Sequence, residues 1–69
     1  MSNMIEIPRK DNIHTLVNCN HIVIAEQYYK DKEEKILITL TTGRIITVEK
    51  DDAGGIYELD VFFETLMNA

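Results

Sequence analysis

The residues that could bind a metal ion are few and gather near the N-terminus. Asp11, His14, Cys19 and His21 form the only cluster of metal-ligand types in the sequence. Structural zinc sites need paired Cys or His elements at defined spacing, and this chain has only one Cys and two His residues. We therefore expect no metal site, and we place these side chains in turns or at the surface.

Nucleophilic catalysis has one candidate pair, the thiol of Cys19 and the imidazole of His21. A lone cysteine is more often a small buried apolar group than a reactive thiolate, and Ser2 lies at a terminus that we expect to fray. The pair therefore does not predict a catalytic site.

Two pairs of adjacent carboxylates, Glu33-Glu34 and Asp51-Asp52, lie in segments that read as loops. An acid or base catalyst needs an apolar pocket that shifts its pKa, and neither loop offers one. The stretch from residue 51 to 55 also lacks the Lys and Ser/Thr of a phosphate-binding loop and the spaced acids of a calcium loop. We interpret it as a flexible turn, and we expect no enzyme, no catalytic residue and no cofactor.

The chain of 69 residues is long enough for one domain, which we assign to residues 1–69. Chains of this size rarely build a core that supplies more than ~3–5 kcal/mol without a disulfide, a metal or a partner. Cys19 has no second cysteine to pair with. Self-association, as a homodimer or a larger assembly, is therefore the expected source of additional stability.

Charge argues against nucleic acid as a partner. The net charge is −5, and the segment after Lys50 contains acids but no basic residue. DNA and RNA binding usually requires a basic patch that displaces counterions. The basic residues that could still converge on one edge, and so support a nucleic-acid-associated regulator as an alternative, are Arg9, Lys10, Lys30, Lys32, Lys35 and Arg44.

Nothing in the sequence directs the chain to a membrane or out of the cell. The N-terminus lacks a basic segment followed by an apolar one, and no apolar run approaches the ~20 residues that span a bilayer. We expect a cytoplasmic protein with no membrane partner.

Alternating apolar residues predict strands, and turn residues separate them. The expected strands are residues 4–7, 13–17, 21–29, 35–41 and 44–49, with a tight turn at Thr42-Gly43. In the third strand we place Ile22, Ile24 and Tyr28 on one face, and Val23, Ala25 and Tyr29 on the other. One of the two tyrosines should then be in the core and the other outward, and the outward one is the better interface candidate.

From Ile56 the apolar spacing changes from two to about 3.6 residues, which predicts a C-terminal helix. The fold class is therefore α+β, mainly β: an antiparallel meander of four to five strands in one sheet, packed by one helix. The helix stripe is formed by Ile56, Leu59, Phe62, Phe63 and Leu66, and further apolar residues lie outside it.

The chain resembles the small bacterial flagellar proteins of the FlbD type. The resemblance is carried, in order, by the segments Met4–Ile7, Leu16–Asn18, Ile22–Glu26, Ile36–Arg44 and Thr47–Lys50. The resemblance covers most of the chain, whereas the charged stretch at 30–35, the acidic stretch at 51–55 and the aromatic helix depart from that family. It implies a non-enzymatic accessory protein that acts through protein contacts, with no catalytic residues to carry over.

The expected function is therefore a protein-interaction module that acts as a homo-oligomer and has an unidentified protein partner. Apolar groups on both faces of the third strand and the wide apolar surface of the helix motivate this expectation. The alternatives are the nucleic-acid-associated regulator and a phage-type inhibitor whose acidic surface occupies a basic groove of a host protein. The candidate interface residues are Tyr29, Tyr57, Val61 and Met67.

Overall fold

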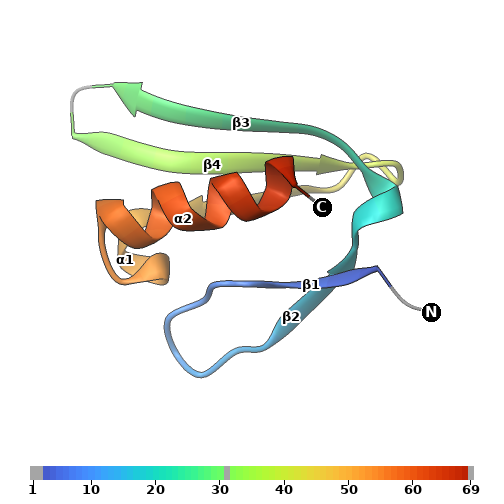
Figure 1. Cartoon of the computed structure of the whole chain (residues 1–69), viewed down its shortest axis with the longest axis horizontal. Helices are drawn as coiled ribbons and strands as arrows, with labels where there is room; N and C mark the ends of the chain where they lie inside the picture. Colours follow the sequence, from blue (N-terminus) through green and yellow to red (C-terminus); the bar gives the residue numbers. More distant parts are fainter. Residues whose placement is uncertain (1–2, 31, 69) are drawn as a thin grey trace.

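The computed structural model describes residues 3–30 and 32–68. Its elements follow the predicted order and confirm a mainly β fold of antiparallel strands with a C-terminal helix (Figure 1). The elements are β1 (Met4–Ile7), β2 (Thr15–Asn18), a 3-10 turn η1 (Cys19–His21), β3 (Ile22–Lys30), β4 (Glu33–Leu40), β5 (Ile45–Glu49), α1 (Lys50–Ala53) and α2 (Ile56–Met67).

The strands form two sheets rather than the single sheet expected. β1 pairs with β2, and β3, β4 and β5 form a second sheet in that order, with every neighbouring pair antiparallel. The division falls at η1, where Asn18 Oδ1 accepts a hydrogen bond of 2.9 Å from the backbone N–H of Asn20. Such a bond turns the backbone locally and ends the strand. Figure 1 shows the β1–β2 hairpin set apart from the larger sheet.

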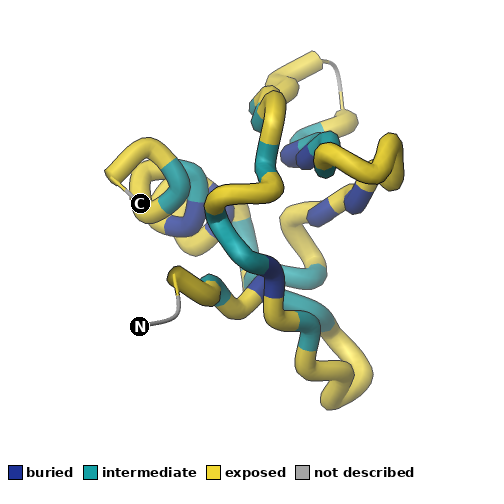
Figure 2. Tube along the Cα trace, turned by 90° about the vertical axis from the view of Figure 1, so that its right-hand side faces the viewer, coloured by how far each residue is buried: buried dark blue, intermediate teal, exposed yellow. Residues whose placement is uncertain are grey.

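The core lies where the hairpin, one face of the three-stranded sheet and α2 meet (Figure 2). All three parts contribute apolar side chains, and the buried residues of the described chain are Ile7, Val17, Ile36, Ile38, Ile46, Val48, Leu59 and Phe62. Phe63 and Leu66 pack against this cluster as partly buried members of the predicted helix stripe. The hairpin thus belongs to the same core as the larger sheet, although it pairs with none of its strands.

The β4–β5 hairpin follows the sequence pattern closely. Ile36 and Ile38 of β4 are paired with Val48 and Ile46 of β5, and all four face the core. The predicted turn is closed by a bond of 2.9 Å from the N–H of Gly43 to the carbonyl of Leu40, with φ of Gly43 at +91°. This positive φ is a conformation that glycine adopts without steric cost.

The acidic stretch at 51–55 is not the flexible turn that we predicted. Lys50–Ala53 forms the short helix α1, and Asp52 Oδ2 accepts a bond of 2.9 Å from the N–H of Glu49 at the start of this helix. Gly54, with φ of +95°, ends α1 in the left-handed conformation. The carboxylate at position 52 is therefore a helix-capping group, which satisfies a backbone donor that the helix itself leaves free.

The face assignment predicted for β3 is wrong at the start of the strand. A bulge between Ile22 and Ile24 breaks the register with β4, so Ile22 packs against the core whereas Val23 and Ile24 are exposed. A bulge places two residues opposite one and so reverses the faces beyond it. At the far end Tyr28 and Tyr29 lie on opposite faces as predicted, with Tyr28 on the outer face and Tyr29 on the face that α2 covers. Both are exposed, so neither is in the core as we had expected of one of them.

Candidate interaction surfaces

The residues that could bind a metal ion or act in catalysis lie apart from one another. Cys19 and His21 belong to η1, where His21 Nδ1 lies 3.2 Å from Thr41 Oγ1. His14 Nδ1 lies 2.7 Å from Glu6 Oε2 across the β1–β2 hairpin, and both side chains are exposed. Within residues 3–30 and 32–68, no three His, Cys, Asp or Glu side chains are grouped to hold a metal ion.

The basic residues do not converge on one edge in the described parts of the chain. Arg44 lies in the turn between β4 and β5, whereas Lys30 and Lys32 lie at the opposite end of β4. Lys35 and Lys50 form ion pairs with Glu33 (3.8 Å) and Glu34 (3.2 Å). This arrangement gives no support to the nucleic-acid-associated regulator.

The four candidate interface residues are all exposed. The exposed fractions are 59% for Tyr29, 72% for Tyr57, 42% for Val61 and 67% for Met67. Tyr57 and Val61 are four residues apart on α2, and Asp60 is three residues after Tyr57 and seven before Met67, so Asp60 lies between Tyr57 and Met67 on the helix surface. Tyr29 projects from β3 and donates a hydrogen bond to Asp60 Oδ1.

The outer face of the three-stranded sheet is a larger apolar surface than the sequence reading assigned. In the register of the sheet, Ile24 of β3 lies beside Thr39 of β4, which lies beside Ile45 of β5. Leu37 and Tyr28 occupy neighbouring positions on the same face, which is opposite to the face that α2 covers. We call these five residues the outer-face patch. Ile24, Tyr28 and Ile45 are exposed, and Leu37 is half-buried.

The patch could be predicted in part from the sequence, because apolar residues occur on both faces of β3. The missing information was the bulge, which decides that Ile24 faces outward. Ile45 is the first residue of β5 and alternates with the buried Ile46, so its outward position could have been found from the period of two.

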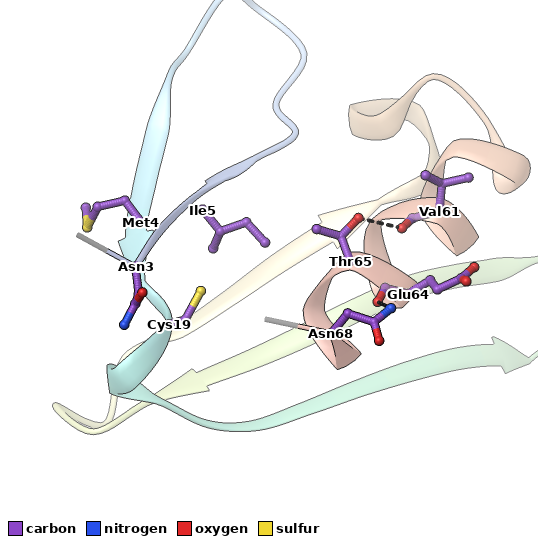
Figure 3. A pocket seen from close by; sticks show the side chains of 8 residues that line it. All are labelled: Asn3, Met4, Ile5, Cys19, Val61, Glu64, Thr65 and Asn68. Atoms are coloured by element: carbon purple, nitrogen blue, oxygen red, sulfur yellow. Dashed lines mark hydrogen bonds between the residues drawn. The ribbon is translucent and has the colours of Figure 1, made fainter. Parts of the chain in front are cut away.

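A groove of about 710 Å³ lies between β1 and α2 (Figure 3). Ile5 of β1 points across it toward Thr65 and Val61 of α2, whereas the Met4 side chain lies on the far side of β1, and Cys19 lies at one end. Its other lining residues are Asn3, Glu64 and Asn68. Its volume is within the range of small-molecule sites, about 300–1,000 Å³. Of the candidate interface residues, Val61 is the one that belongs to this groove.

A polar cluster links α2 to the outer strand of the sheet. Gln27 Nε2 donates a bond of 2.7 Å to Asp60 Oδ1, and the hydroxyl of Tyr29 donates to the same oxygen. Gln27 and Tyr29 are two residues apart and therefore project from the same face of β3. The carboxylate of Asp60 thus fixes the side chains of β3 that face the helix.

Comparison of the chain with protein-family models, with curated proteins and with solved structures finds no match. No helix in the described parts of the chain is long and apolar enough to cross a membrane.

Proposed function

We propose that this chain is a non-enzymatic protein-interaction module that acts as a homo-oligomer. The observation that carries the proposal is the placement of its large apolar side chains. Eight hydrophobic residues of the described chain are buried, whereas twelve large hydrophobic residues are exposed. Scattered apolar side chains are ordinary on protein surfaces, but a continuous group of them marks an interaction site.

The outer-face patch is such a group. Antiparallel sheets with one face in the core usually present alternating polar residues on the other face. Here the row of Ile24, Thr39 and Ile45 and the adjacent Leu37 place aliphatic groups on all three strands of the exposed face. The small core adds a second reason, because a domain of this size gains stability from contacts with another subunit or partner.

An accessory role through protein contacts is also what the resemblance to FlbD-type proteins implies. The acidic helix offers a second kind of contact, because Glu58, Asp60 and Glu64 of α2 are exposed. A partner held through these charges is released by high salt, whereas a partner held by the outer-face patch is not.

The proposal is tested with the variant Ile24→Thr/Ile45→Thr, which removes two exposed aliphatic groups and keeps β-branched residues that suit strands. The matched control is Val23→Thr, a similar change at the exposed bulge. The mass of each protein is measured by light scattering, and binding partners are captured from extracts of the source organism with crosslinking.

We expect the wild-type chain and the control to form an oligomer and to capture the same protein. The double variant should keep its circular dichroism spectrum and lose the captured protein. Either a wild-type chain that stays monomeric at millimolar concentration, or captured proteins that are unchanged in the double variant, would refute the proposal.

A further inference from the structure

The sheet has one long open edge, which is formed by β3. This strand has nine residues and pairs with β4 on one side only. β1 and β2 have four residues each, and β5 has five. The β5 edge is approached by the β1–β2 loop, because the N–H of Lys10 donates a bond of 3.4 Å to Asp52 beside the end of β5. An exposed edge of this length can pair with a further strand.

The hydrogen bonds of the sheet show which backbone groups of β3 are free. The N–H of Leu40 donates to the carbonyl of Arg44 across the β4–β5 turn, so the backbone N–H and C=O groups of Leu40 are directed to β5. The backbone groups of successive residues in a strand are directed alternately to the two neighbouring strands. Those of Lys35 and Leu37 are therefore directed to β3, where these residues are paired with Tyr28 and Glu26.

The residues of β3 that alternate with Glu26 and Tyr28 must direct their backbone groups away from β4. The backbone N–H and C=O groups of Ala25, Gln27 and Tyr29 are therefore directed to the open edge. Their side chains lie on the face that α2 covers, and Asp60 holds those of Gln27 and Tyr29 against the helix. α2 packs over β4, so the backbone of the β3 edge remains accessible.

We propose that β3 pairs antiparallel with β3 of a second copy of the chain, with the two-fold axis at Tyr28. This inference rests on the proposed function and names the surface that forms the oligomer. In this register Gln27 and Tyr29 of one copy exchange backbone hydrogen bonds with Tyr29 and Gln27 of the other. Two three-stranded sheets then form one continuous sheet of six strands.

The charges of β3 select this register. Glu26 and Lys30 are two residues before and two residues after Tyr28, on the same face of the strand. A two-fold axis at Tyr28 therefore places each Glu26 opposite Lys30 of the second copy, with the two Tyr28 rings between these ion pairs. Opposite charges and paired aromatic rings both stabilise antiparallel neighbours.

The neighbouring registers lose this complementarity. An axis at Glu26 would place the two Glu26 carboxylates opposite each other. An axis at Gln27 would place Lys30 opposite Ile24 and Glu26 opposite Tyr28, with no ion pair. Glu26 is the only acid and Lys30 the only base of β3, so an axis at Tyr28 is the one register that places them opposite each other.

The first test is a disulfide crosslink at the proposed axis. Tyr28 and its symmetry mate form a pair without mutual backbone hydrogen bonds, whose Cα atoms lie about 4.5 Å apart. That separation is within the range that a disulfide spans, about 4.4–6.8 Å. In a Cys19→Ala background, Tyr28→Cys should form a covalent dimer under mild oxidation. The matched control is Tyr57→Cys, which replaces an exposed tyrosine on α2 and should stay monomeric on a non-reducing gel.

The second test reverses the charges. Glu26→Lys and Lys30→Glu should each raise the dissociation constant of the dimer about tenfold, because each replaces two symmetry-related attractive pairs by repulsive ones. The double variant Glu26→Lys/Lys30→Glu should restore wild-type affinity. Glu64→Lys makes the same charge change in the groove between β1 and α2, away from β3, and should leave the dissociation constant unchanged.

Both tests use sedimentation equilibrium on the whole chain, and circular dichroism verifies that each variant is folded. An oligomer that neither crosslinks through Tyr28→Cys nor responds to the charge reversals would overturn this inference and leave the proposed homo-oligomer standing. A folded chain that stays monomeric at millimolar concentration would overturn both, and the β3 edge would then be free for a strand of a different protein.

Discussion

Asp51 and Asp52 are adjacent, carry the same charge and begin the same short helix, but the structure gives them different roles. Asp52 accepts hydrogen bonds from the backbone N–H of Glu49 (2.9 Å) and of Lys10 (3.4 Å). Asp51 is exposed and has no hydrogen bond within the described residues. We therefore predict that Asp52→Ala destabilises the protein and that Asp51→Ala has a much smaller effect.

The magnitude follows from the Glu49 bond. Loss of a capping carboxylate costs about 0.5–2 kcal/mol, typically ~1 kcal/mol. The Lys10 contact is longer than an ordinary N–H···O bond and adds little to this value. Both substitutions remove one negative charge from the first turn of α1, so the effect on the helix dipole is common to both and cancels in the comparison. The expected difference between the two variants is ~1 kcal/mol, or about 4–8 °C in Tm.

The measurement is urea unfolding followed by circular dichroism, at one protein concentration so that any self-association is held constant. A protein of this size has a free energy of unfolding of roughly 3–10 kcal/mol, so a change of ~1 kcal/mol is readily detected. Asp52→Asn keeps an acceptor oxygen and should fall between the wild type and Asp52→Ala. Equal midpoints for Asp51→Ala and Asp52→Ala would refute the capping role and favour the flexible turn that the sequence suggested.

Three further substitutions test the core, the link between the helices and the surface contact between His14 and Glu6. Leu59→Ala should cost about 2–5 kcal/mol in urea unfolding because Leu59 is fully buried, whereas Val61→Ala on the exposed side of α2 should cost less than ~1 kcal/mol. Gly54→Ala should lower Tm because φ of Gly54 is +95°, and Gly54→Asn should lower it less; equal losses would contradict the left-handed cap. His14→Ala should change stability by less than ~0.5 kcal/mol, since the His14 and Glu6 side chains are 79% and 55% exposed, and a larger loss would show that the pair is not a simple surface contact.

The strands that the sequence predicted best are those in which local pattern and tertiary burial agree. In β4 and β5 the period of two matches the buried positions, and Gly43 supplies the turn between them. The β1–β2 loop was also predicted from turn residues, and its Asp11 and Asn12 adopt left-handed conformations with φ of 71° and 56°. Asp and Asn tolerate that region better than most residues, which is why their types were informative.

The features that the sequence did not predict depend on contacts between distant residues. The bulge in β3 arises from its pairing with β4, and the residue types around it do not predict it. The helix α1 was obscured because Asp51, Asp52 and the two following glycines are typical of turns, although Asp52 caps a helix. For the same reason the exposure of Tyr29 could be predicted, but its bond to Asp60, 31 residues later, could not.

The two proposed surfaces are connected by the geometry of the sheet. A two-fold axis perpendicular to the sheet at Tyr28 keeps the outer faces of both copies on the same side, and keeps both α2 helices on the other. The outer-face patches, each with Ile24, Leu37 and Ile45, would then lie on one continuous face. Dimerisation through β3 would therefore double the apolar surface presented to a partner, and two linked sites bind more tightly than one. On this reasoning Lys30→Glu, at the end of β3, should weaken partner capture together with the dimer, and Glu26→Lys/Lys30→Glu should restore both, although Lys30 lies outside the outer-face patch.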